Sequence, residues 1–390
     1  MRKVLTICAL ALAFAACSQK QGEPLSLRIV RSEMARCPEA SYLDGKGGEL
    51  KWNYTTGLEL LSFLDVYEDC GDETILDYVD AWYDAIIAED GTVGANYKRS
   101  KHNIDHICPA RTLFTLNRLR PRDKYSKAED FIFAQLQEQP RTEAGAFWHK
   151  DVYPNQVWLD GLYMGEPFYA EYIASRGLGS LWDDVALQFE VAAARTYDPA
   201  TGLWRHAWDE SRSMFWADSV TGQSAHCWGR ALGWYTVALT DVLELFPEEH
   251  PRRHALENIL KGILEVLPLW ADADTHMWYQ VLDRPGAEGN YLESTCSAMF
   301  VYSYLKAARR GEVDGDYAAS LFRSLRDTFI REDEGGLVSL TNCCSVAGLG
   351  GKQMRKGDYD YYINEPVCDN DPKGMGALIR AALIYEADYE

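Results

Sequence analysis

The chain has 390 residues, of which 47% are hydrophobic and 25% are charged, and its formal net charge is −20. Such a charge argues against nucleic acid as a partner, because binding would require Lys and Arg to neutralise phosphates. No Pro/Ser-rich run, low-complexity tract or charge block interrupts the sequence after residue 25, so we expect a single domain over residues 26–390.

The N-terminus predicts an exported lipoprotein. A basic start, MRK, precedes an apolar run from Val4 to Ala16, which is too short to span a bilayer as a helix. The following residues, FAAC at 14–17, resemble a lipobox, which implies cleavage before Cys17 and a lipid on its thiol. We therefore expect a signal peptide over 1–16, a lipidated cysteine and tether over 17–25, and a place in the cell envelope, periplasmic or at the cell surface. An ordinary secretory signal with an unmodified Cys17 is the alternative.

Helix-spaced apolar residues recur along the rest of the chain, and strand signals are few. The pattern predicts helices over 26–37, 54–68, 73–88, 103–118, 126–138, 158–174, 181–196, 226–245, 252–268, 292–309, 315–330 and 373–386. The helices near 73, 126, 181, 252 and 315 are charged on one face and suit an outer layer. Their alternation with less charged helices indicates six helical hairpins.

Six hairpins can close into a ring or stack as an open α-solenoid. Polar and aromatic motifs precede the inner helices: WNYTTG at 52–57, HNIDH at 102–106, the segment around residue 160, HCWGR at 226–230, LESTC at 292–296 and DPKGMG at 371–376. In a closed ring these motifs would converge on one mouth. The positive ends of several helices would then face that mouth and favour an anionic ligand, although the acidic chain must supply local cations for it.

Two carboxylates are candidates for acid–base chemistry. Residues 156–168 read QVWLDGLYMGEPF, which surrounds Asp160 with apolar side chains at a helix start. Poor solvation favours the protonated carboxyl, as a general acid requires. Asp105 lies one hairpin earlier, and paired carboxylates are the usual apparatus of glycoside hydrolysis. For both residues, capping a helix N-terminus is the alternative.

Histidine, tryptophan and arginine side chains surround the same predicted mouth. His149 and His206 lie in aromatic loops ahead of two inner helices. Trp228 and Arg230 offer a stacking ring and a cation that can hold a carboxylate with two hydrogen bonds. The alternative is a core tryptophan with Arg230 paired to a nearby acid. No HExxH or Cys/His metal spacing occurs, so we expect no metal. The vicinal pair Cys343 and Cys344 has no assigned role.

The Asp160 motif, together with the other inner-helix motifs, resembles glycoside hydrolase family 105, the unsaturated rhamnogalacturonyl hydrolases, and the related family 88 glucuronyl hydrolases. The resemblance implies an all-α (α/α)6 toroid and no cofactor. The implied substrate is a lyase-generated oligosaccharide whose non-reducing uronic acid has a C4=C5 bond. One aspartate protonates C4, water adds at C5, and the hemiketal rearranges and releases the sugar.

By match of motif, Asp160 would be the acid/base, and Asp105 would orient it or the water. The residues expected to line the substrate site are His149, His206, Trp228, Arg230, Trp158, Trp234, Trp52 and Tyr54. We expect a pectic oligosaccharide as substrate, with fragments of ulvan, gellan, arabinogalactan or glycosaminoglycan as alternatives. A glycan-binding lipoprotein without turnover, or another toroid enzyme, also remains open. We expect a monomer that touches the membrane only through its lipid.

Overall fold

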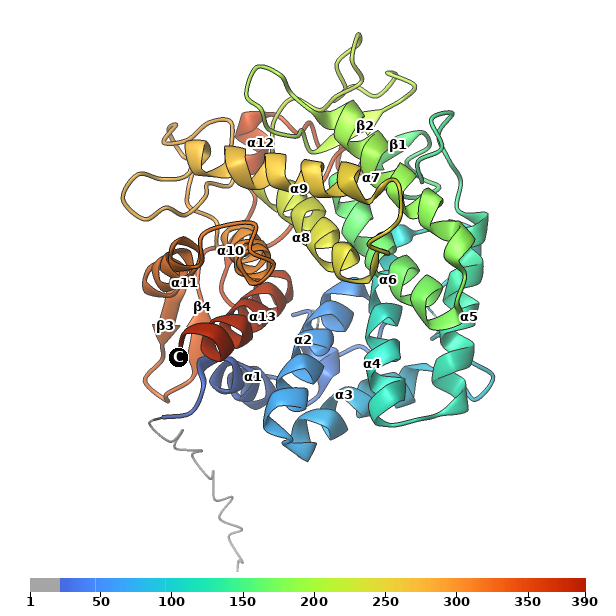
Figure 1. Ribbon diagram of the computed structural model, residues 1–390, viewed down its shortest axis with the longest axis vertical. Coiled ribbons are helices and arrows are strands. Elements are labelled where there is room, and N and C mark those ends of the chain that lie inside the picture. Colours follow the sequence, from blue (N-terminus) through green and yellow to red (C-terminus); the bar gives the residue numbers. More distant parts are fainter. Residues whose placement is uncertain (1–21, 46, 95) are drawn as a thin grey trace, which may run out of the picture.

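Six helices of the computed structural model, which describes residues 22–390 apart from 46 and 95, form an inner ring (Figure 1). They are α2 (Tyr54–Cys70), α4 (Arg111–Leu119), α6 (Leu159–Arg176), α8 (Gly229–Leu245), α10 (Ser294–Arg309) and α13 (Pro372–Tyr389). Each packs against the next, and α13 packs against α2, which closes the ring. The predicted (α/α)6 toroid is confirmed, and the open solenoid is excluded.

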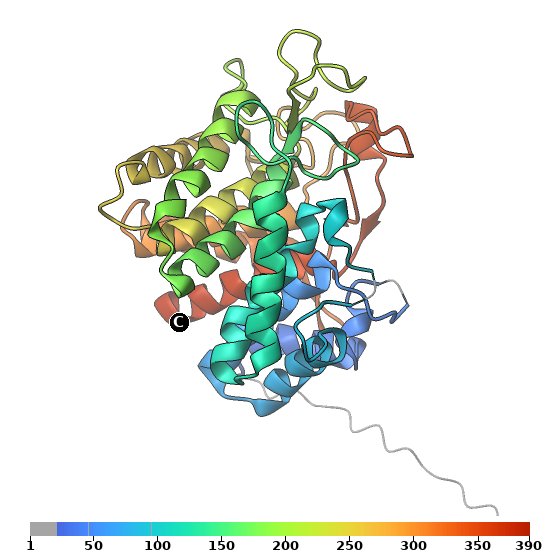
Figure 2. The same cartoon turned by 90° about the vertical axis from the view of Figure 1, so that its right-hand side faces the viewer.

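An outer layer of helices covers the ring, one helix for each inner helix (Figures 1 and 2). Five of them, α3 (Glu73–Ile86), α5 (Asp123–Glu138), α7 (Trp182–Thr196), α9 (Arg253–Val266) and α11 (Gly315–Phe329), pack on the inner helix that precedes them. The sixth, α1 (Leu25–Arg36), packs on α13, so the two ends of the described chain complete one hairpin. No helix among the described residues is long and apolar enough to cross a membrane.

Short elements lie in the loops between these helices. Three antiparallel pairs join β1 (Gln156–Trp158) to β2 (Ala207–Asp209), β3 (Ile330–Glu332) to β4 (Val338–Leu340), and β5 (Cys343–Cys344) to β6 (Val367–Cys368). A one-turn helix, α12 (Tyr359–Ile363), precedes β6. Pieces of two to five residues carry no readable periodicity, so the sequence did not predict them. The predicted signal peptide and Cys17 lie outside the described residues.

The helix predicted over 103–118 is shorter in the structure. Two 3-10 turns, η3 (Ile104–His106) and η4 (Cys108–Ala110), precede α4, which begins only at Arg111. Pro109 explains the delay, because it has no N–H to donate to the carbonyl of Asp105 four residues earlier. Asp105 therefore sits on a tight turn at the end of the ring, ahead of the regular helix.

The inner helices approach one another closely where they carry glycine. A Cβ at Gly229 would come within 2.8 Å of Cys296 Sγ, and one at Gly233 within 2.8 Å of Met299 Sδ. These glycines lie one turn apart on α8, so the absence of side chains there lets α8 pack against the backbone of α10. This contact fixes the start of α8 beside the start of α10.

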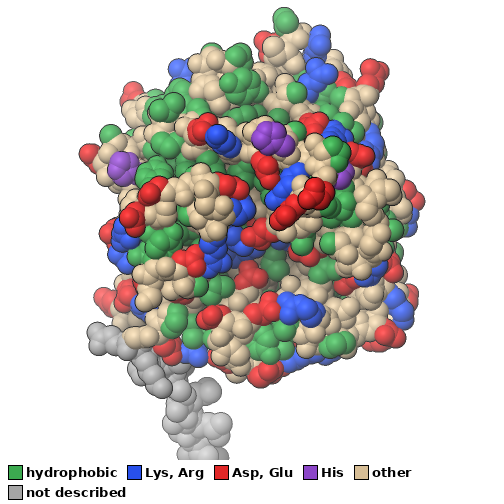
Figure 3. All heavy atoms as spheres, in the orientation of Figure 1, with side chains coloured by type: hydrophobic (Ala, Val, Ile, Leu, Met, Phe, Trp, Pro, Cys, Tyr) green, Lys and Arg blue, Asp and Glu red, His purple; other side chains and the backbone are tan. Residues whose placement is uncertain are grey.

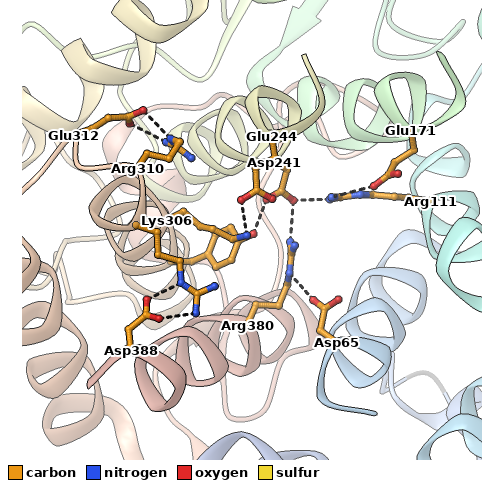
Figure 4. A network of polar contacts seen from close by, with 12 residues as sticks. Asp65, Arg111, Glu171, Asp241, Glu244, Lys306, Arg310, Glu312, Arg380 and Asp388 are labelled. Carbon is orange, nitrogen blue, oxygen red and sulfur yellow. Dashed lines mark hydrogen bonds and ion pairs between the residues drawn. The ribbon is translucent and has the colours of Figure 1, made fainter. Parts of the chain in front are cut away.

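An ion network joins the six inner helices, through the first residue of α4 and through residues in the middle or C-terminal half of the other five (Figure 4). Asp241 of α8 is 2% exposed and accepts hydrogen bonds from Arg111 Nη1 at 2.5 Å, Arg380 Nη1 at 2.8 Å and Tyr302 OH at 2.6 Å. Arg380 also binds Asp65 at 2.9 Å, and Glu171 lies 3.9 Å from Arg111. Each of the six inner helices contributes one of these residues.

A hollow of about 460 Å³ opens beside the ion network. It is lined by charged residues of α2, α4, α6, α8, α10 and α13, including Asp65, Arg111, Glu171, Glu244 and Arg380. Acidic and basic side chains are interspersed over the face drawn in Figure 3, around a central depression. The ring therefore has one end that is bound together by charge and another end formed by the helix starts.

Replacing Asp241 by Asn should destabilise the protein by about 3–5 kcal/mol, because two guanidinium groups on largely buried side chains would lose their shared, buried carboxylate. Burial alone would raise the pKa of Asp241, but Arg380 and Arg111 lower it below its ordinary value. Its folded pKa thus lies below its unfolded pKa, so its stabilisation is present above the unfolded pKa and is lost as the pH falls through the folded one.

Urea unfolding of the two proteins at neutral pH measures this difference. Asp388→Asn is the matched control, because the Asp388–Arg309 pair is partly exposed and should contribute no more than about 1 kcal/mol. Equal stability of the Asp241 and Asp388 variants would contradict a central role for the network.

Candidate active site

A short β-ladder places Asp160 beside His206. In the β1–β2 pair Trp158 lies opposite Ala207, and Leu159 N donates to His206 O at 3.0 Å. Because β1 runs directly into α6, Asp160 lies in the first turn of that helix, and its Oδ2 is 3.2 Å from His206 Nε2. The two atoms are close but are not aligned as a hydrogen bond. Trp158 occupies the N-cap position without a side-chain cap bond, so Asp160 is not the cap.

Asp105 is held by the loop that follows α5. Its Oδ1 lies 3.3 Å from His149 Nε2, and its Oδ2 lies 2.5 Å from Lys150 Nζ. Ile104 N donates to His149 O at 3.2 Å, which ties this loop to the turn that carries Asp105. The side chain of Asn103 accepts from Asp105 N at 3.2 Å and caps the turn. The capping alternative therefore fails for Asp105 as well.

The charges around Asp105 fix its protonation state. Burial alone would raise its pKa, but Lys150 and His149 lower the pKa of Asp105 below its ordinary value. Burial lowers the pKa of His149 to about 4, against the opposing effect of Asp105. At neutral pH Asp105 is thus a carboxylate beside a neutral imidazole and a lysine ammonium.

A row of three rings connects the two carboxylates. His149 stacks on Trp158 with centroids 4.6 Å apart, and Trp158 meets His206 edge-on at 5.4 Å. The order Asp105, His149, Trp158, His206, Asp160 is therefore continuous through contacts. Tyr54, at the start of α2, feels the charges of both acids, which raise its pKa after the larger effect of burial. The two acids therefore belong to one site.

Arg230 brings a buried positive charge to the same region. It lies in the first turn of α8, is 2% exposed, and its guanidinium carbon is 4.6 Å from the Trp228 ring centroid. It donates a hydrogen bond to Cys344 O, and its Nε has no partner. Among the described residues it forms no salt bridge within 4.0 Å, although, against the opposing effect of burial, the nearby acids Glu293 and Asp371 raise its pKa. A buried guanidinium that is not directly paired suits an anionic ligand.

Two predicted residues occupy other positions. Trp52 is fully buried, stacks on Trp82 at 5.7 Å and donates to His106 O at 2.7 Å, so it belongs to the packing of α2 on α3. Trp234 lies one turn below Arg230 on α8 and stacks on Tyr163 at 4.6 Å. Its ring meets Tyr54 at 6.4 Å, which places it beneath the mouth.

Sequence reasoning missed two members of the site. Lys150 follows His149 directly. A basic residue beside a candidate site histidine in an acidic chain could have indicated that Lys150 belongs to the site. Tyr362, on α12, places its hydroxyl 2.7 Å from His206 Nδ1. It lies 156 residues from that histidine, on a one-turn helix that the sequence did not predict.

Within the part of the chain that the structure describes, no group of three His, Cys, Asp or Glu side chains could hold a metal ion. The side chains gathered at the site are carboxylates, imidazoles, cations and aromatic rings. Such a set can move protons and bind an anionic sugar.

Comparisons with known proteins agree with this geometry. The model of Glycosyl Hydrolase Family 88 matches residues 25–387. A solved glycoside hydrolase from family 105 of C. acetobutylicum ATCC 824 is 40% identical, with a TM-score of 0.89 over 94% of this chain and 100% of that one. The unsaturated rhamnogalacturonyl hydrolase YesR of Bacillus subtilis (strain 168) is 24% identical over 75% of this chain and 79% of its own length.

A more distant structure shares the architecture alone. The unsaturated glucuronyl hydrolase of Bacillus sp. GL1 has a TM-score of 0.63 at 15% identity, over 92% of this chain and 94% of that one. The family model and the solved relative together cover the ring, both candidate acids and Arg230. The chain therefore belongs to the glycoside hydrolases of families 88 and 105, whose members include unsaturated glycuronyl hydrolases.

Proposed function

We propose that this enzyme removes the 4,5-unsaturated uronic acid from the non-reducing end of rhamnogalacturonan oligosaccharides that a polysaccharide lyase has produced. The observation that carries the proposal is the pair Asp105 and Asp160, linked through His149, Trp158 and His206 at one end of the ring. Family membership supports the reaction class, and the resemblance to YesR supports the pectic substrate.

Asp160 acts in this proposal as general acid and then as general base. It donates a proton to C4, and the positive charge is shared by C5 and the ring oxygen. Water adds at C5 and returns a proton to Asp160. The hemiketal at C5 opens to a ketone, and the hemiacetal left at C1 releases the shortened oligosaccharide. One water is consumed, and the acid is regenerated.

Asp105 and Arg230 each interact with a charged group of the substrate in this proposal. Asp105 stays ionised beside Lys150, so it can orient the water and stabilise the positive charge that develops at C5. Arg230 offers its guanidinium to the uronate carboxylate, with the Trp228 ring as an apolar wall. Such local cations let an anionic sugar bind to a chain whose formal net charge is −20.

Asp160→Asn should lower the rate of uronate consumption by roughly 10²–10⁴-fold, because the amide cannot donate the proton. Loss of the ultraviolet absorbance of the conjugated C4=C5 uronate, with lyase-generated rhamnogalacturonan fragments, measures the rate. Calorimetric titration should show that the variant still binds the fragments.

Asp388→Asn, at the other end of the ring, is the control and should retain full activity. Consumption of unsaturated glucuronyl fragments in place of the pectic ones would preserve the mechanism and change the substrate. Unchanged turnover by the Asp160 variant would refute the role given to Asp160.

Lys150→Met should move the acidic limb of the kcat/KM profile to higher pH. When the pH is lowered, Asp105 becomes protonated and activity is lost. Lys150 lowers the pKa of Asp105 and so delays this loss. Without this cation the folded pKa of Asp105 rises, so protonation and the loss of activity begin at a higher pH. Lys98→Met, on an exposed side chain, is the control and should leave the profile in place. An unmoved acidic limb in the Lys150 variant would mean that Asp105 does not act in its ionised form.

We also propose that the enzyme is anchored in the cell envelope by a lipid on Cys17. The support is the sequence alone: a basic start, an apolar run and the FAAC segment, followed by a polar tether. Ser26, in the first turn of α1, bonds to Glu386 near the C-terminal end of α13, so the described chain begins away from the helix starts that carry the two acids.

Cys17→Ser should move the protein from the membrane fraction to the soluble fraction, because the thiol that accepts the lipid is gone. Fractionation with immunoblotting measures this, and Cys70→Ser, an exposed cysteine within the domain, is the control. Membrane retention of the Cys17 variant would contradict the anchor.

A further inference from the structure

We propose that Tyr362 is a positioning residue that fixes the tautomer of His206 and so keeps the ring hydrogen on Nε2, the nitrogen that lies 3.2 Å from Asp160 Oδ2. Its effect on turnover depends on the role proposed above for Asp160, whereas the tautomer itself does not. Tyr362 belongs to the short helix α12, which lies at the same end of the molecule as β1 and β2 (Figure 1).

Tyr362 and His206 are both fully buried, and their contact is short. The hydroxyl of Tyr362 lies 2.7 Å from His206 Nδ1, and the opposite ring nitrogen, Nε2, lies 3.2 Å from Asp160 Oδ2. The three side chains therefore form a line from α12 to the first turn of α6. His206 cannot turn freely within it, because its ring packs against Trp158 at 5.4 Å and Trp228 at 4.8 Å.

The direction of the first hydrogen bond follows from the chemistry of the hydroxyl. Burial raises the pKa of Tyr362 well above its ordinary value, so the phenol keeps its proton. A buried O–H group needs an acceptor. Among the described residues, His206 Nδ1 is the one hydrogen-bond partner of this hydroxyl. Tyr362 therefore donates, Nδ1 is the unprotonated nitrogen, and neutral His206 carries its hydrogen on Nε2.

This tautomer has a consequence for Asp160. An Nε2–H group beside Oδ2 favours keeping the acidic proton on the other oxygen, Oδ1, from which it can be delivered. In the opposite tautomer Nε2 would be unprotonated and would accept the carboxyl proton from Oδ2. Asp160 would then transfer its proton to His206 and not to the substrate. Tyr362 thus selects the arrangement in which Asp160 remains available as a proton donor.

The backbone around α12 keeps Tyr362 in place. Gln280 Nε2 donates to Tyr362 O at 3.2 Å, and Gln280 Oε1 accepts from Trp228 Nε1 at 3.0 Å. Asp358 caps α12 by accepting from Tyr361 N at 2.9 Å. The helix is therefore attached to the same wall of the site that holds Trp228.

His149, the partner of Asp105, shows the contrast. Its Nε2 lies near Asp105 as His206 Nε2 lies near Asp160, but its Nδ1 has no hydrogen-bond partner among the described residues. Instead, Nδ1 is 3.1 Å from the point where a Cβ on Gly161 would lie. The phenol donor is thus specific to the histidine of the proposed acid.

Nitrogen NMR of the whole protein labelled with ¹⁵N-histidine tests the proposal. The wild-type His206 signals, assigned by their loss in His206→Gln, should be pyrrole-like at Nε2 and pyridine-like at Nδ1. Tyr362→Phe should give a mixture of tautomers and lower kcat by about tenfold, the effect of one lost hydrogen bond, with little change in KM.

Tyr361→Phe is the matched control, because its hydroxyl accepts from Gly348 N at 3.0 Å and not from His206. It should leave both the His206 spectrum and kcat unchanged. A wild-type His206 that carries its proton on Nδ1 would overturn the proposal even if Tyr362→Phe failed to fold. An unchanged spectrum in a folded Tyr362→Phe protein would overturn it too, as would a shifted tautomer with unchanged kcat. Absence of turnover by the wild type on every unsaturated uronide would refute the proposed function. The tautomer of His206 could still be measured by NMR in that case.

Discussion

The shared carboxylate of Asp241 is the interaction on which the ring depends. Two guanidinium groups, from α4 and α13, converge on a single buried acid of α8, and Tyr302 of α10 completes its hydrogen bonds. Desolvated charges are costly unless geometry satisfies them. A ring built from hairpins has no central strand or sheet to set its diameter, and this network sets it at one end. The opposite end is then free to carry functional groups.

That opposite end gathers its chemistry from chain segments that are far apart. Asp105 sits on the 3-10 turn η3, which Asn103 caps, and Asp160 on a helix that follows directly from a three-residue strand. Neither acid caps its helix, so each carboxyl is available to the neighbouring imidazole. Arg230 relies on a main-chain carbonyl of Cys344 and on an aromatic ring. The site is therefore assembled from helix starts, and loops supply the partners.

The sequence predicted the ring of helices well, but it predicted the direction of individual side chains less well. Alternating charged and uncharged helices predicted the two layers, and motifs ahead of the inner helices indicated where Asp105, Asp160 and Arg230 would meet. The same logic placed Trp52 there, although its ring stacks on Trp82. A motif shows that a residue precedes a helix but not which way its side chain points. Arg230 binds the main-chain carbonyl of Cys344, 114 residues later, and residue type does not predict a contact of this kind.

The ion network also closes one end of the ring. Side chains from all six inner helices meet across the ring at the end opposite the two acids, so the ring is a cup and not a tunnel. A polymer cannot be threaded through a cup, and only a chain end can reach its base. Entry and exit must use the same opening, and one product has to leave before the next chain end arrives. Restriction to terminal sugars would then be a property of the architecture, independent of any contact with the sugar.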